Sequence, residues 1–412
     1  MKLEIDQQRL VSEIESLAAF SDAEPPAVTR IVFTPTERKA RAWVKDLCKQ
    51  AALGIRDDAA GNTFARWEGS DRQAPAVGTG SHIDAVPNAG KYDGVVGVLG
   101  GLEAIRALQK AGLHPRHSID LLVFASEEPT RFGIGCLGSR LLSGTLAPAA
   151  ARALRDGDNK SIDDVRSGAG LPGRLEDVSL PRDYYKAFVE LHIEQGPLLE
   201  RQGKQLGVVE RIAAPASARI TIEGAGGHAG GVLMPDRHDA LCAAAELILS
   251  LEHAARSTGA VDTVATVGMC DVFPGAVNSI PARVLLSVDV RDTSLERRND
   301  VMQQLDDASR KIASKRGVEI YSQLLNADAP AECDAGIIAS LDRACQKHGL
   351  DSMRVTSRAY HDSLFMSRIA PMGMLFIPCH NGYSHRPDEY ASPEDIAGGT
   401  LVLAEILAAL AE

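Results

Sequence analysis

SHIDAVPNAGKYDGVVG, residues 81–97, lies between a strand pattern and a helix pattern. Residues 76–80 are typical of a short buried strand, and apolar residues at helical spacing predict a helix from Gly94 onward. His82 is therefore expected at the end of a strand and Asp93 at the start of a helix. Ligands bind at this edge of an open α/β sheet. An imidazole and a carboxylate placed there are typical of a metal site, although this stretch alone is equally typical of a solvated loop.

Strand and helix patterns alternate as far as about residue 200. The run IDLLVF at 119–124 is largely apolar, as in a strand that helices cover on both faces. The same alternation returns from about residue 327 and ends in an apolar helix over 396–410. The sequence therefore predicts an α/β fold with a mostly parallel sheet flanked by helices.

The pattern changes between these two parts. Alternating strands and two amphipathic helices follow one another in the order β-α-β-β-α-β, which predicts an inserted α+β domain of ferredoxin-like topology. The first helix is predicted over 235–255, and a capping box of Thr293 and Glu296 is predicted to open the second. The predicted domains are residues 1–208 and 327–412 for the catalytic domain and 209–326 for the insert.

Composition excludes several classes of function. The 412 residues carry a net charge of −11, which argues against a general nucleic-acid binder. The sequence contains no signal-peptide pattern and no apolar run that would span a bilayer. The seven cysteines are scattered without a C-x-x-C pair, as in a reduced compartment. We therefore expect a cytoplasmic protein that binds neither nucleic acid nor membranes.

Further motifs follow other predicted strands. Glu127 and Glu128 come directly after 119–124, His192 lies in ELHIEQGP at 190–197, and His385 follows an apolar strand at 374–378. Any one of these residues alone is more typical of a core or a solvated loop. Several such motifs, each at or near the end of a strand, instead favour one shared site.

The candidate metal ligands are three imidazoles and two carboxylates: His82, Asp93, Glu128, His192 and His385. This ligand set suits Zn²⁺, Mn²⁺ or Co²⁺. Five ligands are too many for one open tetrahedral site but suit two ions that share a carboxylate. Glu127 is left to take a proton from a metal-bridging water and return it to a leaving nitrogen. Asp84 is expected to accept the second ring N–H of His82.

These motifs resemble the aminoacylase/carboxypeptidase family of dinuclear metallohydrolases. A histidine in the fourth ligand position, within ELHIEQGP, is similar to the family's N-carbamoyl amidohydrolase branch. The resemblance runs from about residue 30 to the end. It implies a metallopeptidase-like catalytic domain, two divalent metal ions per subunit, and an insert that acts as a lid and dimerisation domain in a homodimer.

The resemblance also implies a role for each matching residue. His82, Asp93 and His192 would hold one ion. The second ion would be held by a set that shares Asp93, namely Asp93, Glu128 and His385. Glu127 would be the general base, and Asp84 would orient His82.

The remaining implied roles concern the substrate. His228, in GGHAG, would come from the partner subunit and stabilise the oxyanion. Asn278 would bind substrate, Arg291 would bind its carboxylate, and Gln195 would lie near the ureido group. A bidentate guanidinium and preorganised oxyanion donors suit these tasks.

Several segments differ from the usual carbamoylase pattern, including GVLMP at 231–235 and RAYHDS at 358–363. They resemble the ureidoglycolate amidohydrolases of this branch. This implies cleavage of (S)-ureidoglycolate to glyoxylate, ammonia and carbon dioxide in purine and allantoin catabolism, with Mn²⁺ favoured. The polar side chains of Tyr360, His361 and Tyr383 are expected to bind the substrate hydroxyl. Tyr383 is equally typical of a packed core tyrosine.

Alternative functions remain at this point. An N-carbamoyl-L-amino acid hydrolase or an allantoate amidohydrolase would use the same metal site. An aminoacylase or dipeptidase is disfavoured because His192 stands where those enzymes have a carboxylate. An inactive metal-binding scaffold would lack a ligand or Glu127, and none is missing.

Overall fold

The computed structural model describes residues 2–412, which form two compact units. The larger unit contains the chain up to Glu210, then Glu332–Ser357 and His361–Glu412. The smaller unit contains Arg211–Ala331 and also Arg358–Tyr360. The segment Arg358–Tyr360 falls within the range 327–412 that the sequence assigned to the catalytic domain, so the chain contributes to the smaller unit twice.

The larger unit is built on a mixed sheet with the strand order β15-β8-β17-β7-β4-β6-β3-β2, and β16 pairs with β8. Its strands are Gly54–Asp57 (β2), Thr63–Trp67 (β3), Ala76–His82 (β4), Ile119–Phe124 (β6), Tyr185–Ile193 (β7), Leu206–Ile212 (β8), Ala331–Glu332 (β15), Ser352–Ser357 (β16) and Met372–Ile377 (β17). The neighbours β17, β7, β4 and β6 are parallel, whereas β8, β3 and β2 join antiparallel. The predicted α/β class with flanking helices is confirmed, but the sheet is mixed rather than mostly parallel, because β8, β3 and β2 join its parallel centre in the antiparallel direction.

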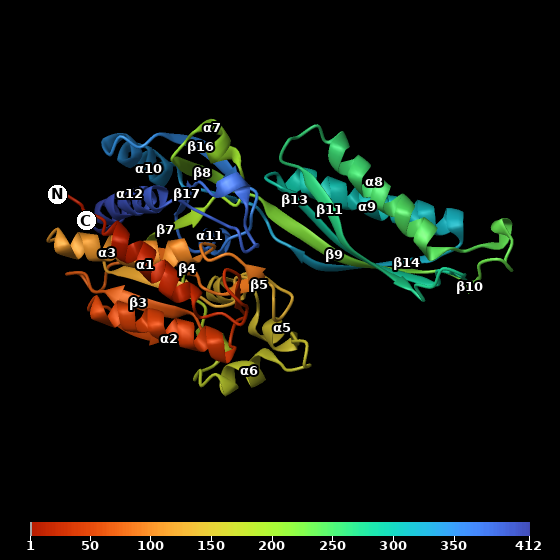
Figure 1. The fold of residues 1–412 in the computed structure, drawn as a ribbon, viewed down its shortest axis with the longest axis horizontal. Helices are drawn as coiled ribbons and strands as arrows, with labels where there is room; N and C mark the ends of the chain where they lie inside the picture. The colour runs from red at the N-terminus through yellow and green to blue at the C-terminus, as the bar shows by residue number, and fades with distance from the viewer. Residues whose placement is uncertain (1) are drawn as a thin grey trace. The chain divides into compact units, whose positions relative to one another are not determined.

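Helices cover this sheet, and its central strands are therefore buried along their length. β4, β6 and β17 are buried at every position. The helices of this unit are Gln7–Ala18 (α1), Pro35–Gln50 (α2), Val95–Lys110 (α3), Leu137–Leu142 (α4), Pro148–Ala153 (α5), Ile162–Gly168 (α6), Leu198–Gln202 (α7), Ala335–Lys347 (α10), Asp362–Met366 (α11) and Pro393–Ala411 (α12). α3 and α12 pack on each other and on β7, and α1 packs beside both (Figure 1).

A short strand pair and two 3₁₀ turns complete the larger unit. Val28–Arg30 (β1) pairs antiparallel with Ala85–Ala89 (β5). The 3₁₀ turns are Leu175–Asp177 (η1) and His380–Gly382 (η3).

The smaller unit has the order β9-α8-β11-β13-α9-β14, and its antiparallel sheet has the strand order β11-β13-β9-β14. Its elements are Ala214–Glu223 (β9), Gly227–His228 (β10), Met234–Asp236 (η2), Ala240–Ser257 (α8), Val264–Phe273 (β11), Ser279–Ile280 (β12), Arg283–Asp292 (β13), Leu295–Arg316 (α9) and Glu319–Ala327 (β14). The helices α8 and α9 pack together against the sheet (Figure 1), and Ile220, Leu247 and Leu305 lie in the core between them. The predicted ferredoxin-like insert is confirmed.

Two predicted helix starts in this unit are wrong. The first helix begins at Ala240 rather than at 235, because the Asp239 side chain accepts hydrogen bonds from the N–H groups of Leu241 and Cys242. The second is capped by Ser294, whose side chain accepts from the Arg297 N–H, and not by Thr293. Within residues 2–412, every helix is too short or too polar to cross a membrane.

Candidate metal centre

The predicted metal ligands of the larger unit lie at one edge of its sheet. His82 is the last residue of β4 and His192 the next to last of β7, while Glu128 follows β6. Because β17, β7, β4 and β6 are parallel neighbours, their carboxyl ends meet at the same edge. Asp93 precedes α3, and His385 lies in the loop after β17.

Local backbone geometry brings these side chains close together. Gly94 has φ +66°, and a Cβ there would lie 2.5 Å from the His82 ring, so only glycine allows this approach between Asp93 and α3. Ser126 and His385 also have positive φ, at 56° and 58°. Such backbone conformations are uncommon outside glycine and cluster at functional sites.

The five side chains form two ligand groups that share Asp93. One group is His82, Asp93 and His192, and the other is Asp93, Glu128 and His385, with the ligand atoms of each group within 4.8 Å of one another. Asp93 Oδ1 lies 3.2 Å from His192 Nε2, and Asp93 Oδ2 lies 3.1 Å from His385 Nε2. Glu128 Oε1 lies 3.3 Å from His385 Nε2.

Hydrogen bonds within the larger unit prepare both strand histidines for a cation. His82 Nδ1 lies 3.0 Å from the Asp84 carbonyl oxygen, and His192 Nδ1 lies 2.9 Å from the Ile193 carbonyl oxygen. A carbonyl only accepts, so each Nδ1 carries the proton and each Nε2 keeps its lone pair. The Gly94 N–H donates to His192 Nε2 over 3.2 Å, and a metal ion at this nitrogen would take the place of that hydrogen bond. Imidazole and carboxylate donors arranged this way fit a divalent transition metal.

The electrostatics of the cluster favour positive charge. Burial alone would raise the pKa of Asp93, but hydrogen bonds with His192, His385 and His82 hold that pKa well below its usual value. Hydrogen bonds to Asp93 and Glu128 raise the pKa of His385 to about 11. These carboxylates therefore stabilise a cation at this edge, in the form of a proton or a metal ion.

Glu127 lies beside the cluster but belongs to neither ligand group. Its Oε2 lies 3.7 Å from His82 Nε2, and the buried Cys136 thiol donates to its Oε1 over 3.3 Å. Burial raises the pKa of Glu127 well above its usual value, and Glu128 adds to this effect. A carboxylate that holds a proton readily is suited to acid–base chemistry.

Asp84 does not orient His82 in the way the sequence suggested. Its Oδ1 lies 3.7 Å from His82 Nδ1, beyond hydrogen-bonding distance, and its backbone carbonyl accepts the hydrogen bond from Nδ1 instead. The carboxylate accepts hydrogen bonds from the N–H groups of Glu127, over 3.3 Å, and Glu128, over 3.1 Å. These two donors lie in the turn after Ser126, and Asp84 therefore fixes the backbone of both glutamates.

Gln195 contacts the shared carboxylate. Its amide nitrogen donates to Asp93 Oδ2 over 2.7 Å. Its amide oxygen is buried and has no hydrogen-bond partner among residues 2–412. The Ser384 hydroxyl also lies 2.9 Å from Asp93 Oδ2 and 2.8 Å from Glu389 Oε2. Sequence reasoning missed Glu389, which no motif or spacing marks.

The polar residues predicted to bind the substrate hydroxyl lie in different surroundings. His361 is buried, with its ring centroid 4.5 Å from that of His192 and its Nε2 3.1 Å from Ser357 Oγ. Tyr360 belongs to the smaller unit and donates its hydroxyl proton to Asp328. Tyr383 is half-buried in the loop that carries His385, with the Arg386 guanidinium 3.8 Å above its ring. Of the three, Tyr383 is the one that is half-buried in the larger unit, two positions before the predicted ligand His385.

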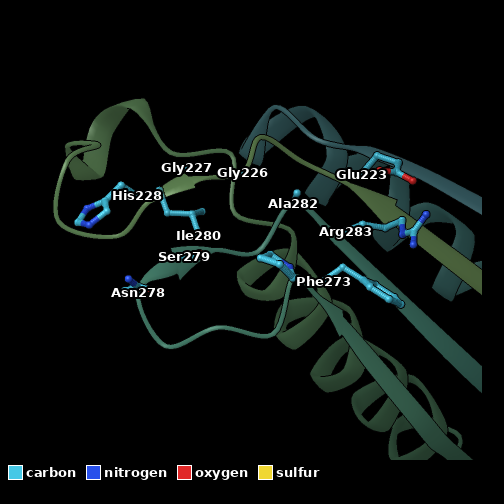
Figure 2. Close-up of a pocket in the computed structure, with 11 residues that line it drawn as sticks. Glu223, Gly226, Gly227, His228, Phe273, Asn278, Ser279, Ile280, Ala282 and Arg283 are labelled. Atoms are coloured by element: carbon cyan, nitrogen blue, oxygen red, sulfur yellow. The ribbon is translucent and has the colours of Figure 1, made fainter.

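The predicted lid residues lie in the smaller unit. His228 ends β10, which pairs with β12, and the Ala229 N–H donates to the Asn278 carbonyl oxygen. His228 and Asn278 both line a cavity of about 730 Å³ that also includes Phe273, Ile280 and Arg283 (Figure 2). The Gly230 N–H donates to Nδ1 of the exposed His228 ring over 3.1 Å, so the ring proton is on Nε2.

Arg291 lies on β13 of the same unit, where Asp289 accepts from its Nε over 2.7 Å. This ion pair anchors one edge of the guanidinium. About a third of the side chain is exposed.

The chain matches the model of Peptidase family M20/M25/M40 over residues 78–409. Ureidoglycolate hydrolase of Oryza sativa subsp. japonica is 50% identical, over 98% of this chain and 85% of its own length. N-carbamoyl-L-amino acid amidohydrolase of Geobacillus stearothermophilus is 38% identical, over 97% of each chain.

Solved structures of similar proteins align with nearly the whole chain. Crystal structures of AtUAH in complex with (S)-hydroxyglycine and with glyoxylate each align with a TM-score of 0.92 at 48% identity, over 99% of this chain and 98% of that chain. The family resemblance inferred from the motifs is thereby confirmed. This chain is a member of peptidase family M20/M25/M40, a hydrolase whose metal-binding site lies at the carboxyl edge of its central strands.

Proposed function

We propose that this hydrolase cleaves the ureido C–N bond of (S)-ureidoglycolate, a small carboxylate, to give glyoxylate, ammonia and carbon dioxide. The observation that carries the reaction type is the shared Asp93 between two ligand groups, with the protonatable Glu127 beside them. Identity of 50% to a ureidoglycolate hydrolase over nearly the whole chain supports the substrate.

The reaction balances with one water. Hydrolysis of the ureido group releases carbon dioxide and one ammonia and leaves (S)-hydroxyglycine, which then loses a second ammonia to give glyoxylate. Both of these small acids are ligands in the AtUAH structures, and this supports the same sequence of products here.

We assign two divalent ions per subunit to the metal site, with Mn²⁺ favoured and Zn²⁺ or Co²⁺ as alternatives. His82, Asp93 and His192 would hold one ion, and the group that shares Asp93 with Glu128 and His385 would hold the other. When bound, the pair supplies Lewis acidity toward the ureido carbonyl and toward a water molecule. The residues of the chain then have to move protons and orient the substrate.

Glu127 takes the proton of the attacking water and delivers it to the leaving nitrogen. Burial raises its pKa, so the carboxyl group holds this proton long enough to return it. The unpartnered amide oxygen of Gln195 is assigned to accept an N–H of the ureido group. Tyr383 is assigned to the substrate hydroxyl, because the hydroxyl of Tyr360 is bound to Asp328 and His361 is buried.

The smaller unit is assigned the role of lid and dimerisation domain. The Nε2–H of His228 is a donor suited to a developing oxyanion. Asn278 is assigned to bind substrate, and Arg291, held by Asp289, its carboxylate. The edge strands β11 and β14 expose apolar side chains such as Met269 and Leu324, each at 58%, and a second copy of the chain would cover them. Cytoplasmic localisation stays a prediction.

A substrate comparison tests this function. The Mn²⁺-reconstituted protein is expected to release ammonia from (S)-ureidoglycolate with a kcat/KM about 10²-fold or more above that for N-carbamoylglycine, which lacks only the hydroxyl. Allantoate and several N-carbamoyl-L-amino acids complete the panel. Preference for a carbamoyl amino acid would favour the function of the Geobacillus relative and contradict the proposed substrate.

Tyr383→Phe is expected to lower the preference for (S)-ureidoglycolate over N-carbamoylglycine by about 10-fold, since it removes a hydroxyl while keeping the ring under Arg386. The measurement is kcat/KM for both substrates. Tyr360→Phe is the matched control, because the Tyr360 hydroxyl is bound to Asp328. An unchanged preference in Tyr383→Phe would remove Tyr383 from substrate recognition.

Asp84→Asn is expected to reduce kcat by about 10- to 100-fold. The amide keeps one acceptor oxygen, so one N–H in the turn of Glu127 and Glu128 faces an NH₂ group instead. Kinetics and bound metal are measured together. Asp334→Asn is the control, because Asp334 also accepts two backbone N–H groups, those of Gly336 and Ile337. Equal kcat values for the two variants would contradict the role of Asp84.

A further inference from the structure

The proposed metal ligands Asp93 and His385 lie in two loops that are far apart in the sequence, and the buried carboxylate of Glu389 joins these loops. Glu389 Oε1 accepts hydrogen bonds from the N–H groups of Tyr92, over 2.8 Å, and Asp93, over 3.1 Å. Glu389 Oε2 lies 2.8 Å from the hydroxyl of Ser384, the residue before His385. That hydroxyl also lies 2.9 Å from Asp93 Oδ2, so it lies between the two carboxylates and donates its single proton to one of them at a time.

The loop that precedes Asp93 packs so closely on Glu389 that position 90 accommodates only glycine. A Cβ at Gly90 would lie 2.3 Å from the Glu389 Cβ, so the loop before Asp93 passes directly over this side chain. The rings of Tyr92 and Tyr390 meet edge to face at 6.0 Å and join the same two segments. Residues 90–93 and 389–390 are therefore joined by backbone hydrogen bonds, by the two tyrosine rings and by the close approach at Gly90.

Glu389 is buried, and hydrogen bonds stabilise its carboxylate. The residue is 4% exposed, and it accepts from the N–H groups of Tyr92 and Asp93 and lies within hydrogen-bonding distance of the Ser384 hydroxyl. A buried carboxylate is costly to a fold unless hydrogen bonds or a nearby positive charge stabilise it. The positive charge that the neighbouring ligand groups are built to hold would compensate it.

We propose that Glu389 is a positioning residue of the metal centre, which fixes Asp93 and His385 relative to each other and thereby sets the affinity of the Asp93–Glu128–His385 site. This inference rests on the two-ion centre of the proposed function. His82 and His192 are carried by strands, whereas His385 is half-exposed on a loop with positive φ. The site that contains His385 is therefore the one that depends on Glu389.

Titration of the metal-free, full-length protein with Mn²⁺ tests the proposal, with no substrate present. Isothermal titration calorimetry of wild type is expected to give two sites. In Glu389→Gln the first site stays within about 3-fold of wild type, and the affinity of the second falls by about 10- to 100-fold. The glutamine keeps an acceptor for the two N–H groups, but its NH₂ group can only donate to Ser384 Oγ, which leaves Asp93 as the sole acceptor of the Ser384 proton in this contact.

Ser384→Ala is the second variant, because it removes the bridging hydroxyl and leaves the backbone contacts of Glu389 in place. It is expected to weaken the same site, and the double variant should be no weaker than Glu389→Gln, since the two residues act through one contact. Asp334→Asn, which alters a carboxylate that accepts two backbone N–H groups at the start of α10, is expected to leave both affinities unchanged.

The outcomes separate the two proposals. Two Mn²⁺ sites that Glu389→Gln and Ser384→Ala leave unchanged would contradict the role of Glu389 alone. Equal weakening of both sites, together with a lower melting temperature of the metal-free protein, would assign Glu389 to the fold instead. A single site in wild type would contradict the two-ion centre and, with it, the selective effect.

Discussion

Glu127→Gln is expected to reduce kcat by about 10³-fold while KM changes by less than about 3-fold and both metal sites remain. The amide has nearly the shape of the carboxyl group but cannot accept the proton of the attacking water. Glu127 belongs to neither ligand group, so its loss leaves the metal ligands in place. Single-turnover kinetics and metal analysis of the same preparation measure both effects.

We expect Glu127→Gln to stabilise the metal-free fold even though it lowers the activity. A carboxyl group whose pKa is raised in the folded state stabilises the fold less as pH rises from its unfolded pKa through its folded pKa. Burial raises the pKa of Glu127 in this way. Metal-free Glu127→Gln is therefore expected to melt at a higher temperature than metal-free wild type at pH 8, and the difference should shrink near pH 4.

Glu128→Gln is the matched variant for this comparison. The neighbouring residue is equally buried and follows the same strand, but it belongs to the second ligand group. Its replacement should reduce both activity and bound metal, whereas Glu127→Gln should reduce activity only. Loss of metal from Glu127→Gln would mean that Glu127 is itself a ligand and not the base.

Most of the fold of the larger unit, and both ligand groups, could be predicted from the sequence. The reason is that the end of a strand is marked by a local sequence pattern. A strand pattern such as IDLLVF places Glu127 and Glu128 just after the end of a strand. Because neighbouring strands at the centre of the sheet are parallel, such ends lie close together at one edge. The ferredoxin-like insert was predictable for the same reason, since its strands and helices have clear periods of two and 3.6 residues.

The features that sequence reasoning missed depend on contacts between distant segments. Asp84 offers both a carbonyl and a carboxylate to His82, and the turn at 126–128 decides which one is used, because its N–H groups take the carboxylate. Glu389 accepts from the N–H of Asp93, 296 positions earlier in the chain. No local pattern specifies either pairing.

The two helix starts were predicted wrongly because, in each case, two residues a few positions apart are both suited to begin a helix. Pro235 is a common first residue of a helix, but here it lies in a 3₁₀ turn and Asp239 caps the helix. Thr293 and Ser294 both carry a hydroxyl, and the Asp292 carboxylate decides between them because it accepts the N–H of Ser294 over 2.7 Å. Such choices follow from hydrogen bonds of the folded chain.

His228→Ala is expected to reduce kcat by about 10²- to 10³-fold with little change in bound metal, because it removes a donor to the developing oxyanion. The ring is exposed in the smaller unit, whereas both ligand groups belong to the larger unit, and its Nδ1 accepts from the Gly230 N–H. The proton on Nε2 is therefore available to a substrate. Steady-state kinetics with (S)-ureidoglycolate and metal analysis measure this effect.

Subunit mixing then decides which chain supplies His228. If the partner subunit supplies it, a His228→Ala subunit paired with a Glu127→Gln subunit holds one complete site, composed of Glu127 from the first and His228 from the second. Random exchange of equal amounts in a symmetric dimer would recover about a quarter of wild-type activity. Exchange is verified by mass-tagged subunits, and verified exchange without recovered activity would contradict the shared site, since each chain would then need its own His228.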